Sequence, residues 1–116
     1  MSNLNRVCIP IVSDTATAFE RGFRAPFNGK IISSGAAVNV AVTTATSNIT
    51  VEIDNVAVTG LAHAITTARA VGYCEKKVPS GTTANLSFRE GQYVSVVGDG
   101  GGDAGNCTIT LDVQQD

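Results

Sequence analysis

Residues 49–59 of the chain read Ile-Thr-Val-Glu-Ile-Asp-Asn-Val-Ala-Val-Thr, and this stretch decides the fold class. Apolar residues at 49, 51 and 53 alternate with polar residues at 50, 52 and 54, which is the period of a β-strand with one buried face. Asp54 and Asn55 then form a pair that favours a tight turn, and apolar residues resume at Val56. The stretch therefore predicts a β-hairpin.

Strand-like segments of the same kind recur along the chain. Residues 36–42 and 108–114 alternate in the same way. Their predicted inward-facing residues are Val38, Val40, Val42, Ile109, Leu111 and Val113. About eight or nine short strands follow one another at intervals of roughly 8–12 residues, which is typical of a sandwich or barrel. We predict an all-β protein: a single antiparallel β-sandwich, jelly-roll-like. An immunoglobulin-like strand order is disfavoured by the absence of a Cys…Trp…Cys pattern.

Three segments fit more than one local structure or contain residues that favour particular turns. Residues 61–71 fit a helix or a strand, and Thr66 with Thr67 favours the strand because β-branched side chains lose freedom in a helix. Residues 28–29, Asn-Gly, predict either a hairpin turn or a bulge in a long bent strand. Residues 89–91, Arg-Glu-Gly, predict a turn with glycine in the left-handed conformation.

The composition supports this fold class and disfavours several functions. The length of 116 residues suits one domain. Hydrophobic residues make up 43% and charged residues 16%, and Val, Ala, Thr and Gly dominate, which disfavours both a helix bundle and a disordered chain. A net charge of −2 predicts no nucleic-acid partner. No apolar run approaches the ~18 residues that cross a membrane, and no signal peptide is visible.

Residues 1–20 form a distinct opening before the steadier pattern of residues 21–116, which we assign to the β-sandwich domain. Residues 7–12 are apolar but include Pro10, which cannot donate a hydrogen bond within a sheet. The opening is therefore an N-terminal arm or an edge strand. Deleting residues 1–14 would separate these two interpretations, and from the sequence we expect the sandwich to stay folded while attachment to a partner weakens.

The three cysteines, Cys8, Cys74 and Cys107, lie far apart in the sequence. An odd and sparse set predicts free, half-buried thiols in a reducing compartment, with a Cys74–Cys107 bridge as the alternative. The chain has no Cys-x-x-Cys pair and only one histidine, so we expect no zinc site.

Residues that could perform catalysis are few. His63 is the only histidine and therefore the only candidate base of a Ser-His-Asp arrangement, but its alternating apolar segment favours a packing role. Carboxylate pairs for glycoside hydrolysis could be drawn from Glu52, Asp54, Glu75 and Glu90. Glu52 and Asp54 alternate with core residues, which places them on the solvent face. We therefore expect no enzymatic activity and no catalytic residues.

The glycine-rich segment at residues 98–106 is the most unusual part of the sequence. Asp99, Asp103 and Asn106 could offer oxygen ligands to Ca²⁺. A long hairpin loop at one end of the sandwich is the simpler interpretation, and contact with a partner is a third. We therefore predict no metal site, with these three residues as the weak candidates.

The candidate partner-binding residues lie near the N-terminus. They are candidates because arginine and aromatic residues dominate binding hot spots, and because an exposed apolar edge strand needs another surface to cover it. They are Val7, Ile9, Ile11, Phe19, Arg21, Phe23 and Arg24. The alternative role for the phenylalanines is core packing, which we favour for Phe27.

Five segments, in their order along the chain, resemble the small β-sandwich proteins of tailed bacteriophages. They are residues 24–32 (Arg-Ala-Pro-Phe-Asn-Gly-Lys-Ile-Ile), 49–56, 89–96, the glycine loop and residues 107–113. In that family, a Pro-Phe-x-Gly-x-Ile strand begins the fold and a glycine-containing hairpin precedes the last strand. The resemblance covers about residues 21–114.

Members of this family are typically capsid decoration (cement) proteins or heads of short fibres, and are usually trimeric. The resemblance implies a structural virion protein on the outer capsid surface, made in the host cytoplasm, with copies of itself and the major capsid protein as partners. It implies no cofactor. The alternative is a fibre knob or a carbohydrate- or receptor-binding module, for which only Tyr73 and Tyr93 and no Trp are available.

Overall fold

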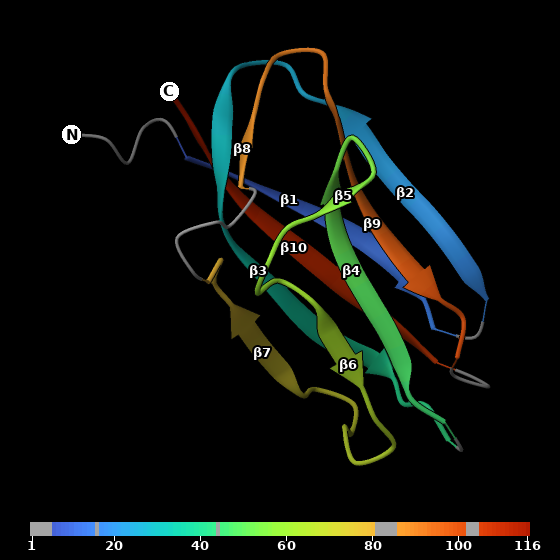
Figure 1. The fold of residues 1–116 in the computed structure, drawn as a ribbon. Helices are drawn as coiled ribbons and strands as arrows, with labels where there is room; N and C mark the ends of the chain where they lie inside the picture. Colours follow the sequence, from blue (N-terminus) through green and yellow to red (C-terminus); the bar gives the residue numbers. More distant parts are fainter. Residues whose placement is uncertain (1–5, 16, 44, 81–85, 102–104) are drawn as a thin grey trace.

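The chain folds as two antiparallel β-sheets packed face to face, as the computed structural model shows (Figure 1). The structure describes residues 6–15, 17–43, 45–80, 86–101 and 105–116. In the first sheet, sheet A, the strand order is β1 (Arg6–Asp14), β10 (Asn106–Gln115), β3 (Gly29–Val40) and β7 (Cys74–Lys77), and β8 (Ser87–Phe88) also pairs with β3. In sheet B the order is β2 (Ala18–Arg24), β9 (Tyr93–Asp99), β4 (Ser47–Ile53) and β5 (Val56–Ala57), and β6 (His63–Ile65) also pairs with β4.

The pairing of the strands is nested. β1 pairs with β10, β2 with β9, and β3 with β8. The first strand of the chain therefore lies beside the last strand, and the second strand lies beside the second-to-last. β1 and β2 are the outermost strands of their sheets on one side of the sandwich, and β7 and β6 lie at the opposite side. The all-β sandwich predicted from the sequence is confirmed. Among the described residues, no helix is long and apolar enough to cross a bilayer.

The core lies between the two sheets and follows the alternation seen in the sequence. Ile49, Val51 and Ile53 of β4 are buried, as are Ile109, Leu111 and Val113 of β10. The prediction for Val40 is wrong, because this side chain is 48% exposed. The register of β3 against β10 jumps from Val38 to Val40, so Asn39 is an extra residue that turns Val40 outward.

The N-terminal segment is an edge strand of sheet A. β1 pairs with β10 over nine residues, from Arg6 opposite Gln114 to Asp14 opposite Asn106. Pro10 lies within this edge strand, as its missing N–H requires. β2 spans residues 18–24 and therefore crosses the predicted boundary between residues 20 and 21.

The turn at Asp54 and Asn55 is confirmed. Both residues have positive φ, 47° and 67°, as a two-residue type I′ turn requires, and they join β4 to β5. The hairpin or bulge predicted at Asn28-Gly29 is wrong, because this segment carries the chain from β2 in sheet B to β3 in sheet A. Glycine is needed at position 29 for space, since a Cβ there would lie 2.4 Å from the carbonyl oxygen of Gln114.

The strand predicted over residues 61–71 is reduced to the three residues of β6. The chain then turns, with the N–H of Arg69 donating to the carbonyl of Thr66 and the N–H of Tyr73 to that of Ala70. The glycine turn at residues 89–91 is confirmed, with Gly91 at φ 94°, but it connects the two sheets.

Candidate functional site

The side of the sandwich formed by β6 and β7, the β6–β7 side, contains a buried polar network. His63 projects inward from β6, is 1% exposed, and lies between a serine and a glutamate from sheet A. Its Nε2 is 2.8 Å from the Oγ of Ser34, and its Nδ1 is 2.6 Å from the Oε2 of Glu75. The three side chains therefore connect strands β3, β6 and β7 across the interior.

Two further groups hold the carboxylate of this network. The hydroxyl of Tyr73 donates to Oε1 of Glu75 at 3.1 Å, and a guanidinium nitrogen of Arg69 lies 3.9 Å from the same oxygen. The Arg69 guanidinium also stacks on the Tyr73 ring, 4.2 Å from its centroid. Burial raises the pKa of Glu75, but hydrogen bonds from His63 and Tyr73 and the nearby positive charges outweigh it and lower that pKa below its ordinary value.

Serine, histidine and a carboxylate in this order are the groups of a nucleophilic triad. Catalysis also requires that the serine hydroxyl meets a substrate, and Ser34 is 0% exposed within the core. The imidazole pairs with the Ser34 hydroxyl through Nε2 and with Glu75 through Nδ1, so the polar atoms of His63 and Ser34 have partners in the core. The arrangement therefore braces the two sheets. The sequence could not identify Ser34 or pair Glu75 with His63, because strand register brings them together.

The opposite side, formed by β1 and β2, is closed mainly by apolar groups. Phe19 and Phe23 of β2 are half-buried against the core, and the Phe19 ring occupies the space where a Cβ on Gly98 would lie. The Arg21 side chain projects from the same face of β2 as these two phenylalanines. It donates a hydrogen bond to the carbonyl oxygen of Val12 at 2.9 Å and so links sheet B to sheet A. Three of the predicted partner-binding residues thus contribute to the closure of the fold.

The remaining predicted partner-binding residues have mixed surroundings. Ile9 and Ile11 of β1 are half-buried against the core, Val7 is 44% exposed, and Arg24 is exposed at the end of β2. Their role in partner binding stays a prediction.

The free edge of β1 is poorly suited to pairing with another strand. The Val12 carbonyl accepts from Arg21, which marks this carbonyl as directed away from β10. Pro10 is two residues earlier in the strand, so its backbone nitrogen is also directed away from β10. Because proline has no N–H, the free edge lacks a hydrogen-bond donor at this position. A missing donor and an occupied acceptor are the means by which natural edge strands avoid sheet extension.

The middle of the outer face of sheet A is built from small side chains. The register places three rows across it. One row holds Val12, Thr108, Ala37 and Cys74; the next holds Pro10, Thr110, Gly35 and Lys76; the third holds Cys8, Asp112 and Ser33. Val12 is 58% exposed. Because no bulky side chain stands on these rows apart from Lys76, a second protein surface can approach the backbone closely.

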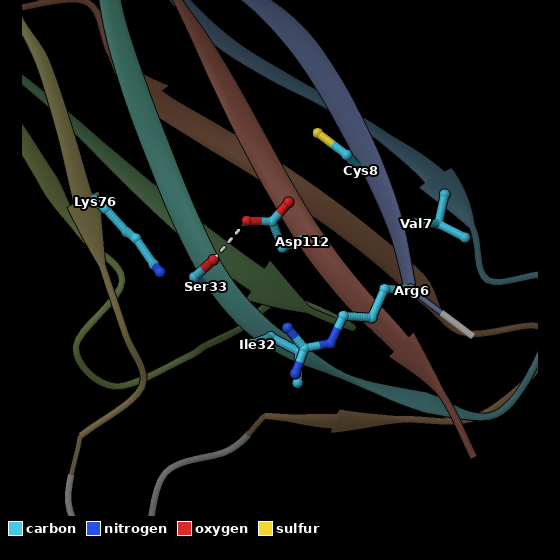
Figure 2. A pocket seen from close by; sticks show the side chains of 7 residues that line it. All are labelled: Arg6, Val7, Cys8, Ile32, Ser33, Lys76 and Asp112. Atoms are coloured by element: carbon cyan, nitrogen blue, oxygen red, sulfur yellow. Dashed lines mark hydrogen bonds between the residues drawn. The ribbon is translucent and has the colours of Figure 1, made fainter. Parts of the chain in front are cut away.

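A pocket of about 290 Å³ lies on this face between β1 and β7 (Figure 2). It is lined by Arg6, Val7, Cys8, Ile32, Ser33, Lys76 and Asp112. The hydroxyl of Ser33 donates to Oδ2 of Asp112 at 2.7 Å. Arg6 and Lys76 are directed to the pocket from the two outer strands of the sheet. The sequence alone does not identify this group of residues, because they come from four strands and the sequence does not specify the register between those strands.

The three thiols are free. Partial burial, the negative charge of Asp112 and a hydrogen bond to that carboxylate raise the pKa of Cys8, and burial raises the pKa of Cys107 to about 11. Cys74 lies on the outer face of sheet A and Cys107 on its inner face, so the alternative of a bridge between them is not realised. Two of the predicted half-buried thiols, Cys8 and Cys74, are in fact exposed.

The glycine loop joins β9 to β10 and so connects the two sheets. Asp99 accepts from the backbone N–H groups of Asn48 and Gly101 and from the Asn48 amide, and these hydrogen bonds lower its pKa. Asn106 begins β10, and Asp103 lies outside the described residues. Within the described part of the chain, no group of three or more histidine, cysteine or acidic residues could hold a metal ion.

The other candidate carboxylates are not gathered into a site. Asp54 is exposed and accepts from the N–H of Tyr93 and the amide of Gln92, which lowers its pKa. Glu52 is half-buried on the outer face of sheet B, and Glu90 is exposed in the turn before β9. Comparison with known proteins adds no assignment: no protein-family model and no curated protein matches the chain.

Proposed function

We propose that this protein is a structural component of a bacteriophage particle, a homotrimeric decoration protein that binds the outer surface of the capsid. The observation that carries the proposal is the outer face of sheet A, with its rows of small side chains and its exposed Val12. Such a face suits close contact with another protein and offers little for binding a small substrate.

The position of the Ser-His-Glu network also supports a structural role. Ser34 and His63 are both buried in the core, where they satisfy one another instead of meeting a ligand. The nested pairing of the strands has the order of a jelly roll, and we infer that topology for this chain. Jelly rolls are frequent in viral capsid proteins, which agrees with the family resemblance of the sequence.

A carbohydrate-binding role, the alternative, has less support from the aromatic residues. The Tyr73 ring is covered by the Arg69 guanidinium and its hydroxyl is engaged by Glu75. Tyr93 is 36% exposed and the chain has no Trp. One partly exposed ring is a poor stacking platform for a sugar.

The test is the mass in solution together with attachment to phage shells assembled without the protein. We expect a light-scattering mass near three times 11.9 kDa and co-sedimentation with the shells. Thr110→Arg places a long charged side chain at the centre of the face and should abolish trimer formation, attachment or both, while the circular dichroism spectrum keeps its β-sheet form. Thr59→Arg, at an exposed turn, is the matched control. A wild-type chain that stays monomeric and does not sediment with shells would overturn the proposal.

A further inference from the structure

We propose that the pocket on the outer face of sheet A binds the carboxylate of a glutamate or aspartate side chain presented by a protein partner. This inference rests on the proposed function, because it names the chemistry by which that face recognises the protein it attaches to. The two cations of the pocket carry the argument, because among the described residues neither forms an ion pair.

Arg6 and Lys76 reach the pocket from β1 and β7, the two outer strands of sheet A (Figure 2). Among the described residues, neither has a carboxylate within 4 Å, since the ion pairs there involve only His63 and Arg69 with Glu75. Two cations at one pocket repel one another. An incoming carboxylate removes that repulsion and gains charge-assisted hydrogen bonds, with the arginine able to bind both oxygens.

Asp112 is the one acidic residue in the pocket, and a neutral donor occupies it. Its carboxylate accepts from the Ser33 hydroxyl at 2.7 Å. Asp112 is thus held against the sheet by Ser33, and the pocket retains one positive charge in excess.

The size of the pocket favours a single side chain over a larger ligand. Its volume of about 290 Å³ is at the lower limit of the ~300–1,000 Å³ that small-molecule sites occupy. The rows of small residues beside it leave room for the partner's backbone, so an acidic side chain can enter while the surrounding surfaces meet. A charged pair beside these rows also fixes the orientation of the partner.

The inference is tested by following backbone amide signals in NMR spectra while N-acetyl-glutamate amide is added to the full chain. We expect saturable shifts at Cys8, Ser33 and Lys76 with an affinity on the order of millimolar, as a ligand of this size allows. N-acetyl-glutamine amide, which has the same shape without the charge, should produce no saturable shift. Equal shifts with both compounds, or none with either, would overturn the inference.

Substitutions separate this site from alternatives. Arg6→Gln and Lys76→Gln should each weaken binding of the capped glutamate about tenfold, whereas Arg24→Gln, at an exposed cation on β2 of sheet B, should leave it unchanged. Asp112→Asn should tighten binding about threefold, because it removes a negative charge beside the ligand. Weaker binding of the capped glutamate in Asp112→Asn would show that the charge of Asp112 does not oppose the ligand, which contradicts the inference.

Two further outcomes keep the two proposals distinguishable. If Thr110→Arg breaks the trimer but the capped glutamate does not bind, only the inference about the pocket fails. If inorganic phosphate shifts the same signals at concentrations at which the capped glutamate does not, the pocket binds a phosphate oxyanion and the carboxylate assignment is wrong.

Discussion

The two sides of the sandwich are closed by opposite chemistry. On the β1–β2 side, Phe19 and Phe23 pack against the core and a hydrogen bond from Arg21 joins the sheets. On the β6–β7 side, the sheets are joined by the buried chain of hydrogen bonds from Ser34 through His63 to Glu75. On an apolar side, the loss of unfolding free energy is proportional to the apolar area that a substitution uncovers. In a buried polar network, removing one side chain leaves its partners unsatisfied, so a single substitution has a large effect.

The largest expected effect concerns the strand that covers the β1–β2 side. Deleting residues 1–14 removes all of β1, uncovers β10 and exposes the core beneath Ile9 and Ile11. We expect a loss on the order of 5 kcal/mol in the free energy of unfolding, comparable to the whole stability of a small domain. This reverses the expectation from the sequence, in which the truncated sandwich stays folded.

Circular dichroism melting and the dispersion of amide signals would measure the effect of the deletion. Val12→Ser, an exposed position on the same strand, is the control and should melt within a few degrees of the wild type. A well-folded truncated chain would mean that β1 contributes little to the fold and acts as an arm after all.

Breaking the polar closure should be the next largest effect. His63→Ala leaves Ser34 and Glu75 without their shared partner in the interior, and we expect a loss of about 2–4 kcal/mol measured by urea unfolding. In a double-mutant cycle with Glu75→Gln, the two losses should add to more than the loss in the double variant. Strict additivity would show that the two side chains act independently.

Breaking the apolar closure one side chain at a time should cost less. Phe19→Ala should lower the unfolding free energy by about 1.5–2 kcal/mol, since its ring is only half-buried, and Arg21→Ala by about 0.5–1 kcal/mol, since it is exposed. Both are measured by urea unfolding beside His63→Ala. An equal loss of unfolding free energy in Arg21→Ala and His63→Ala would contradict the proposed difference between the two sides.

The smallest expected effect is the pH dependence of the β6–β7 side. The pKa of Glu75 is lower in the folded chain than its ordinary value, so its ionised form stabilises the fold above that ordinary value. This contribution is lost as pH falls through the folded pKa. The difference in unfolding free energy between wild type and Glu75→Gln should therefore shrink as the pH falls from about 4.5 downward. A difference that grows over that range would contradict the lowered pKa of Glu75.

Local pattern was sufficient for much of the fold. Alternation in residues 49–53 and 109–113 identified buried strands, Asp54-Asn55 identified a turn with positive φ, and Pro10 identified an edge. These features depend on neighbouring residues alone. The pattern failed at Val40 and at residues 28–29, because a bulge and a crossing between sheets are set by partners distant in the sequence.

The sites depended on the tertiary structure for the same reason. The sequence contained His63 and Glu75 as isolated candidates but not their pairing with Ser34, and it did not select Arg6, Lys76 and Asp112 as a group. By itself the sequence determined that the chain forms half-buried strands with one hydrophobic face, since that needs only a period of two. Strand order and register decided which polar residues meet, because they bring together side chains such as those of Ser33 and Asp112, which are 79 positions apart in the sequence.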